Sequence, residues 1–99
     1  MNSYETLYIV KPNMEEEARV ALIAKFSDII TANGGEVENV DEWGIKKLAY
    51  AIDYINEGYY VLVNFKAAPE LPQELERNFK INESIMRYMV IRREEKQGA

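Results

Sequence analysis

Apolar residues recur along this chain with two spacings, one typical of strands and one typical of helices. Four stretches rich in β-branched and aromatic residues predict strands: residues 4–11, 36–52, 59–66 and 85–93. The second stretch is long for a single strand, and Gly44 within it predicts a bulge. These strands supply the sheet against which the other elements must pack.

A first helix is predicted between the first two strands. Its apolar residues follow a spacing of three and four and form one stripe: Leu22, Ile23, Phe26, Ile29 and Ile30. Asn13, which follows Pro12, is expected to cap the N-terminus, with Glu16 three positions later as in a capping box. The pair Gly34-Gly35 is expected to end the helix.

A second helix is predicted from Pro69 or Pro72 onward, because both prolines suit a first helical turn. Its apolar residues share one face: Leu71, Leu75 and Phe79. Before it, residues 56–58 (Asn-Glu-Gly) have the composition of a turn. The second and third strands are therefore expected to form a hairpin.

The predicted order of elements is β-α-β-β-α-β. Two right-handed β-α-β crossovers that share a sheet produce an α+β, ferredoxin-like split β-α-β sandwich. In this fold a four-stranded antiparallel sheet carries two helices on one face and leaves the other face open. A chain of 99 residues supports one such domain, expected over residues 1–93, with a short polar tail at 94–99.

Strand alternation predicts which side chains the helices leave uncovered. The helix side is assigned to Val61, Val63, Phe65 and Val90, with Arg87 on the opposite side of the last strand. The open side then carries a set of large residues: Leu7, Ile9, Tyr60, Leu62, Met89 and Ile91. An exposed apolar patch of this kind commonly marks an interface, so we expect partner binding there. Self-association, or partial shielding by the tail, is the alternative.

Composition excludes several classes of function. The chain has no histidine and no cysteine, which removes the usual zinc sites, nucleophile pairs and neutral-pH proton shuttles. No catalytic residue, metal or cofactor is therefore predicted. The apolar windows are strand-length and broken by charge, so no membrane-spanning helix is expected, and the absence of cysteine fits a reducing cytoplasm.

Charge patterning adds a second expectation. With 12 basic and 17 acidic residues the net charge is −5, which is unfavourable for a protein that binds RNA alone. The cations gather on the two predicted edge strands and just beyond: Lys46, Lys47, Arg87, Arg92, Arg93 and Lys96. They fit local phosphate contacts, and they equally fit protection of sheet edges against aggregation.

Residues 41–52, Asp-Glu-Trp-Gly-Ile-Lys-Lys-Leu-Ala-Tyr-Ala-Ile, resemble the signature segment of a bacterial ribosomal protein family, that of the sixth protein of the small subunit. Tyr4-Glu5, residues 58–60 and residues 86–90 extend the resemblance over nearly the whole chain. The resemblance implies a ferredoxin-like fold and no enzymatic activity. It also implies binding to the central domain of the small-subunit ribosomal RNA, as a heterodimer with a small basic ribosomal protein, the eighteenth of the subunit.

On this basis a set of RNA-binding residues is predicted: Tyr4, Lys46, Lys47, Tyr50, Arg87, Arg92 and Arg93. Tyr4 could face either side of its strand, and Tyr50 could stack on RNA or fill the core. Trp43 is interpreted as a packing anchor, since a large ring usually buries most of its area.

Two other classes of protein remain possible at this stage. One is an RNA-recognition motif domain, but residues 58–62 (Gly-Tyr-Tyr-Val-Leu) lack its third-strand signature. The other is a ferredoxin-like interaction or regulatory domain that self-associates through its open sheet face.

Overall fold

The computed structural model describes residues 1–52 and 54–93, so the predicted tail lies outside the described residues. Six elements follow one another in the predicted order: β1 (Asn2–Val10), α1 (Glu16–Ala32), β2 (Glu36–Ile52), β3 (Ile55–Ala67), α2 (Leu71–Ile81) and β4 (Ile85–Arg93). The strands form one antiparallel sheet in the order β2-β3-β1-β4. The predicted split β-α-β sandwich is confirmed, with β2 and β4 at its edges.

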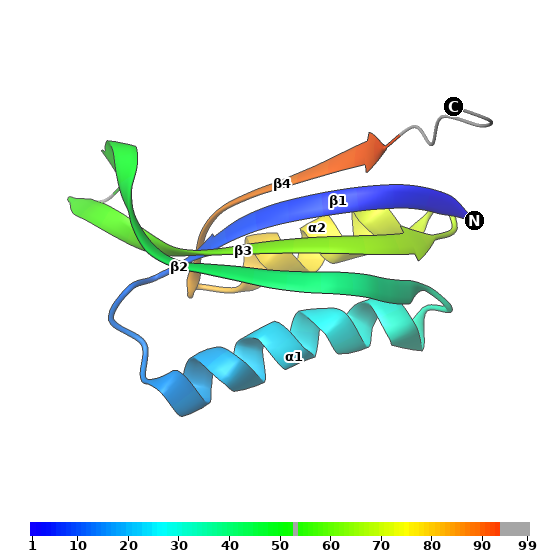
Figure 1. Ribbon diagram of the computed structural model, residues 1–99, viewed down its shortest axis with the longest axis horizontal. Helices are drawn as coiled ribbons and strands as arrows, with labels where there is room; N and C mark the ends of the chain where they lie inside the picture. Colours follow the sequence, from blue (N-terminus) through cyan, green and yellow to red (C-terminus); the bar gives the residue numbers. More distant parts are fainter. Residues whose placement is uncertain (53, 94–99) are drawn as a thin grey trace.

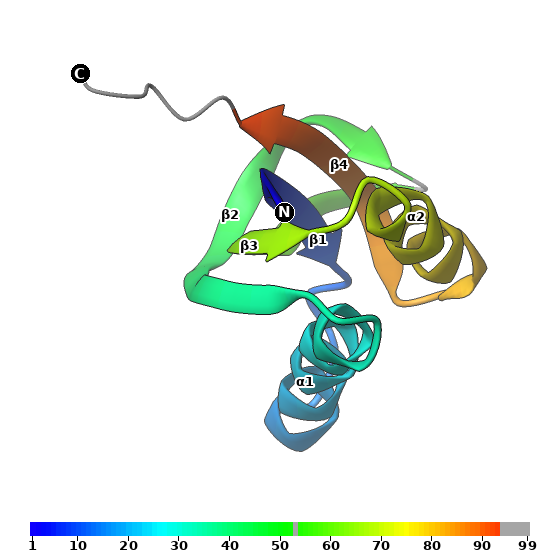
Figure 2. The same ribbon diagram turned by 90° about the vertical axis from the view of Figure 1, so that its right-hand side faces the viewer.

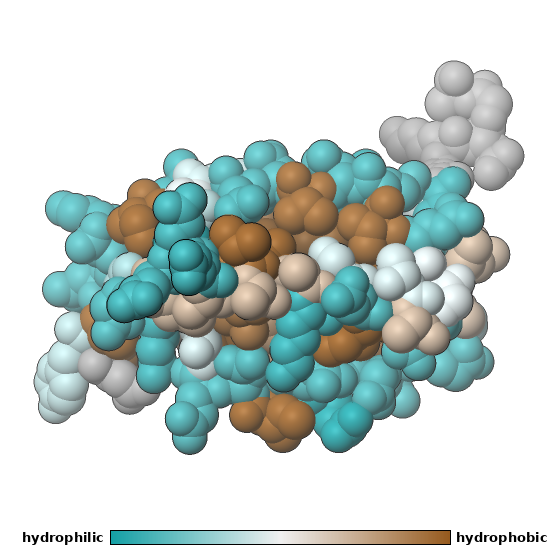
Figure 3. Space-filling view, turned by 90° about the horizontal axis from the view of Figure 1, so that it is seen from below, coloured by the Kyte–Doolittle hydropathy of each residue, from teal (hydrophilic) through white to brown (hydrophobic). Residues whose placement is uncertain are grey.

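Both helices lie on one side of the sheet, as the view along the strands in Figure 2 shows. In Figure 1 the far part of the β2–β3 hairpin bends away from α1 at one end of the sheet and rises toward the level of β4. Figure 3 shows the molecule from the side on which α1 lies, where hydrophilic side chains surround separate apolar areas. The opposite side of the sheet carries no helix.

Three aromatic rings tie both helices to the central strand β1. The ring centroids of Tyr8 and Phe26 are 5.3 Å apart, those of Tyr8 and Phe79 are 5.0 Å apart, and those of Phe26 and Phe79 are 4.5 Å apart. Such close, tilted arrangements add attraction beyond the burial of area. The helix-side assignment of the β3 residues is confirmed, since the buried core includes Val61, Val63 and Phe65.

The start of α1 differs from the prediction. The helix begins at Glu16, and Glu15 occupies the N-cap position with extended backbone and no side-chain hydrogen bond. Asn13 lies instead in the turn that Pro12 begins, so the predicted capping box is wrong. Negative charge in the first turn, from Glu16 and Glu17, compensates by favourable interaction with the helix dipole.

The hairpin also differs from the prediction, because residues 56–58 belong to β3 and are not the turn. Lys46 pairs with Gly58 and Lys47 with Glu57, while Ile52 pairs with Ile55. The chain therefore reverses between Ile52 and Ile55.

Gly58 has a packing role in place of the turn role. A Cβ on Gly58 would overlap Cγ2 of Ile9 on the neighbouring strand and would lie 3.6 Å from Sδ of Met86. Glycine is therefore required by a close approach of side chains to the backbone of β3.

We predict that Phe79→Ala lowers the free energy of unfolding by about 3–5 kcal/mol, because it removes a ring that contacts both Tyr8 and Phe26. The matched control is Ile81→Ala on the same helix, where the side chain is exposed. The control is expected to change stability by about 0.5 kcal/mol or less. Urea unfolding followed by circular dichroism measures both, and equal losses would contradict the aromatic cluster as the centre of the core.

We predict that Gly58→Ala destabilises the fold by about 1–3 kcal/mol, because the new methyl group must displace the branched side chain of Ile9. Alanine is otherwise the better strand residue, so an unstrained site would show no loss. Glu57→Ala, one position earlier and exposed, serves as the control and is expected to be nearly neutral. An unfolding midpoint for Gly58→Ala at or above that of the original protein would refute the close-packing role.

Candidate functional site

The open face of the sheet is built from rows of residues that lie opposite one another on neighbouring strands. Leu7 of β1 lies opposite Leu62 of β3 and Met89 of β4. The adjacent row on the same face places Glu5 between Asn64 and Ile91. Apolar side chains from three strands are thus brought together, because strand pairing places opposite residues within contact distance.

These rows surround a hollow of about 300 Å³, lined by Glu5, Leu7, Trp43, Leu62, Met89 and Ile91. Met89 is 52% exposed and Ile91 45% exposed, so two large apolar side chains of the edge strand face solvent. Four of the six residues predicted for partner binding line this hollow. A fifth, Tyr60, lies beside it and stacks on Trp43.

Ile9, the sixth of those residues, differs from its neighbours. It lies on the predicted face, opposite Tyr60 and Arg87, but its side chain is only 6% exposed. The absence of a side chain at Gly58 lets Ile9 pack against the backbone of β3. Ile9 is therefore a packing residue beneath the open face and is not available for contact with a partner.

Trp43 belongs to the open face, although the strand alternation did not place it there. In β2 the register shifts between Glu42, opposite Val61, and Gly44, opposite Tyr60, so Trp43 is the extra residue of a bulge. The bulge predicted at Gly44 is thereby confirmed, and Gly44 has a φ of 84° that favours glycine. A bulge changes the direction in which a side chain points. The glycine that follows Trp43 is therefore the sequence signal that could have identified Trp43 as a residue of this face.

The indole ring of Trp43 is held in a defined position. It stacks on Tyr60 with a centroid distance of 6.1 Å and an interplanar angle of 10°. Its Nε1 donates a hydrogen bond of 3.0 Å to Oδ2 of Asp41. The ring remains 42% exposed, so Trp43 anchors Tyr60 and also presents area to solvent.

The predicted RNA-binding residues separate into two groups at opposite ends of the sheet. Lys46 and Lys47 lie on the hairpin and are exposed, and Arg87, opposite Ile9, lies at the same end. Because the two lysines are adjacent in a strand, they point to opposite sides. Tyr50, further along the hairpin, is 81% exposed and thus does not fill the core.

The second group lies six positions further along β4, about 20 Å away at the rise of a strand. Arg92 Nη2 donates a hydrogen bond of 3.2 Å to Asn2 Oδ1. Arg93 Nη1 donates one of 3.3 Å to Asn64 Oδ1. Both guanidinium groups are exposed and keep further donors for other acceptors.

Tyr4 does not join either group. Its ring is 6% exposed and stacks on Phe65 at a centroid distance of 5.5 Å, on the helix side of the sheet. The prediction of Tyr4 as an RNA-binding residue therefore does not fit its position, because alternation places it in line with the buried Thr6 and Tyr8. The sequence prediction missed Tyr54 near the hairpin reversal, which is fully exposed and has a φ of 65°.

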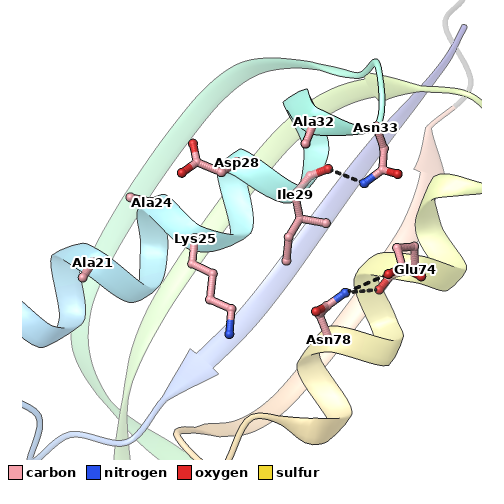
Figure 4. A pocket seen from close by; sticks show the side chains of 9 residues that line it. All are labelled: Ala21, Ala24, Lys25, Asp28, Ile29, Ala32, Asn33, Glu74 and Asn78. Carbon is pink, nitrogen blue, oxygen red and sulfur yellow. Dashed lines mark hydrogen bonds between the residues drawn. The ribbon is translucent and has the colours of Figure 1, made fainter.

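A groove of about 610 Å³ lies between α1 and α2. Figure 4 shows Lys25 and Ile29 of α1 facing Glu74 and Asn78 of α2 across it. The Asn78 Nδ2 group donates to the backbone oxygen of Glu74 at 2.8 Å, so its amide is engaged within the helix. The groove combines an amine, carboxylates and amides, with no nucleophile and base in contact.

Perturbed titrating groups do not point to catalysis either. The Tyr59 hydroxyl donates a hydrogen bond of 2.7 Å to Glu42 Oε1, and this bond raises the pKa of Tyr59. Burial raises the pKa of Tyr8. Since both shifts are upward from an already basic value, both hydroxyls stay protonated at neutral pH. Within residues 1–52 and 54–93 no cluster of acidic side chains could hold a metal ion, and no helix is long and apolar enough to cross a membrane.

Fold and site together define a small α+β domain with an open apolar sheet face and basic residues on its edge strands. Residues 3–92 match the model of the ribosomal protein S6 family. The chain belongs to that family, which confirms the predicted class: a structural constituent of the bacterial small ribosomal subunit, cytoplasmic and not an enzyme.

Similar proteins agree with this membership. The chain is 59% identical over 91 residues to small ribosomal subunit protein bS6 of Clostridium novyi, covering 92% of this chain and 96% of the relative. It is 57% identical over 94 residues to bS6 of Alkaliphilus oremlandii, covering 95% and 99%. The crystal structure of 30S ribosomal protein S6 from Thermotoga maritima superposes with a TM-score of 0.88 at 33% identity, covering 93% of this chain and 87% of that one.

Proposed function

We propose that this chain binds the central domain of the small-subunit ribosomal RNA as a heterodimer with a small basic ribosomal protein, the eighteenth of that subunit. Membership of the family places the chain in the small ribosomal subunit. The observation that carries the proposal is the apolar hollow on the open face, with Met89 and Ile91 exposed beside it. A patch of this kind on a soluble domain favours a protein partner. The proposed contact residues are Leu7, Trp43, Tyr60, Leu62, Met89 and Ile91.

The charge distribution supports a basic partner. The net charge is −5, and the cations of the edge strands are divided between two ends of the sheet. Each group alone neutralises few phosphates, so counterion release from this chain by itself is small. A basic protein on the open face supplies the missing cations and leaves the edges of the sheet for RNA. The proposed RNA contacts are Lys46, Lys47, Tyr50, Arg87, Arg92 and Arg93.

The hairpin is the part of the chain best suited to RNA contact. It extends away from the helices (Figure 1). Tyr50 presents an exposed ring on the same strand as the lysine pair. Aromatic rings beside cations combine base stacking with phosphate contact, which is how single-stranded RNA is commonly held.

We predict that Ile91→Glu weakens the heterodimer by about a hundredfold or more, because the charge must be desolvated in an apolar contact. The free protein is expected to lose about 1 kcal/mol or less, since the side chain already faces solvent. Binding to the purified partner by isothermal titration calorimetry, with circular dichroism of the free variant, measures both effects.

The matched control is Ile81→Glu on α2, where the isoleucine is also exposed, 67% against 45% for Ile91. If both variants bind the partner normally, the open face is not the interface. If the unmodified chain forms a stable homodimer that Ile91→Glu dissolves, self-association through this face replaces the heterodimer.

We predict that the double variant Lys46→Ala/Lys47→Ala lowers the affinity of the heterodimer for ribosomal RNA and reduces the slope of log K against log salt by about 2. One unit of slope is expected for each phosphate contact removed. Stability is expected to stay nearly the same, because both side chains are exposed. Filter binding at several salt concentrations provides the slope.

Lys25→Ala/Lys80→Ala makes the same change in net charge on the two helices and is the control. Equal slopes for the two double variants would mean that the lysine pair acts only through overall charge. Tight RNA binding by the isolated chain at physiological salt would contradict the need for a basic partner.

A further inference from the structure

A single carboxylate stands among the apolar side chains of the open-face hollow. Glu5 lines the hollow together with Leu7, Leu62 and Met89, and its side chain is half-buried. No hydrogen bond or ion pair joins this carboxylate to any residue that the structure describes. An unpaired carboxylate in such surroundings loses part of its hydration without compensation, so a cationic group placed there gains a strong partner.

An aromatic wall completes the hollow. The indole of Trp43 lines it, and this ring is held by stacking on Tyr60 and by its hydrogen bond to Asp41. A ring fixed in this way can receive a cation with little further loss of side-chain entropy. Asp41 lies opposite Leu62 on the same face, so a second carboxylate borders the site.

We propose that this hollow is a socket for one arginine side chain of the protein partner. Its guanidinium group would pair with the Glu5 carboxylate and stack on Trp43, while its aliphatic stem would pack along Leu7 and Met89. The inference deepens the proposed partner interface and rests on it. It goes further in naming the chemistry that the open face selects.

Other occupants match the hollow less well. RNA would bring phosphates toward Glu5 and Asp41, which repel negative charge. A lysine ammonium is compact and strongly hydrated and lacks the planar fork that pairs with a carboxylate while stacking on a ring. A purely apolar side chain would leave the carboxylate of Glu5 desolvated and unpaired. Register places two cations one row from Glu5, on either side of Ser3: Arg93, which is hydrogen-bonded to Asn64, and Lys66, which pairs with Glu38.

The test uses the fluorescence of Trp43, the single tryptophan of the chain. The free protein is titrated with Nα-acetyl-arginine amide and, in parallel, with the corresponding lysine and citrulline amides. Arginine is expected to change the emission of Trp43 saturably, at concentrations on the order of millimolar for so small a probe. Citrulline keeps the shape and loses the charge, and lysine keeps the charge and loses the fork, so both are expected to bind more weakly.

Two variants test whether the arginine probe binds at Glu5. Glu5→Gln is expected to weaken the arginine probe about tenfold, because it removes the charge from the paired acceptor. Glu76→Gln makes the same charge change on α2 and is expected to leave the titration unchanged. Equal responses to arginine and citrulline in the unmodified protein, or an unchanged response in folded Glu5→Gln, would overturn the socket.

Binding to the purified basic partner separates this inference from the proposed function. If the partner binds the unmodified chain and Glu5→Gln alike, the arginine socket is refuted while the heterodimer stands. If the partner does not bind at all, the heterodimer proposal fails, and the arginine titration still decides whether the socket recognises its chemistry.

Discussion

The packing of both helices on the same side of the sheet determines most of what this protein presents to its surroundings. Tyr8 of β1 contacts Phe26 of α1 and Phe79 of α2, so the two helices are joined through one strand. Because both helices pack against this cluster, no helix covers the other face of the sheet, which is also rich in apolar residues. That uncovered face is a cost to an isolated domain and an advantage to a component of a larger assembly.

Two local departures from regular strand geometry convert the uncovered face into a shaped surface. The bulge before Gly44 turns Trp43 onto the face, where it stacks on Tyr60. The missing side chain at Gly58 allows Ile9 to sink against β3. The first departure brings Trp43 to the hollow that Glu5 also lines, and the second buries Ile9 next to Tyr60 on the same face.

Acidic and basic residues occupy different parts of the sheet. Glu5 and Asp41 place carboxylates on the open face, whereas the cations proposed for RNA contact lie on the edge strands β2 and β4. A cationic protein and a polyanionic RNA can therefore be accommodated on different parts of one small domain. The net charge of −5 does not reveal this division, because it sums the acidic and basic residues without regard to their positions.

The sequence by itself determined the order of elements, the buried faces of β1, β3 and β4, the stripe of α1 and the lack of catalytic groups, because periodicity and composition are local properties. It misplaced the N-cap of α1, because Asn13 takes part in the turn that Pro12 begins. It misplaced the hairpin reversal, because pairing of β3 with β2 overrode the turn chemistry of residues 56–58. Only the tertiary structure decided that Trp43 faces outward, that Ile9 and Tyr4 are buried, and that the cations form two groups. Those outcomes depend on register between strands far apart in the chain, and a shift of one residue in register moves a side chain to the other face.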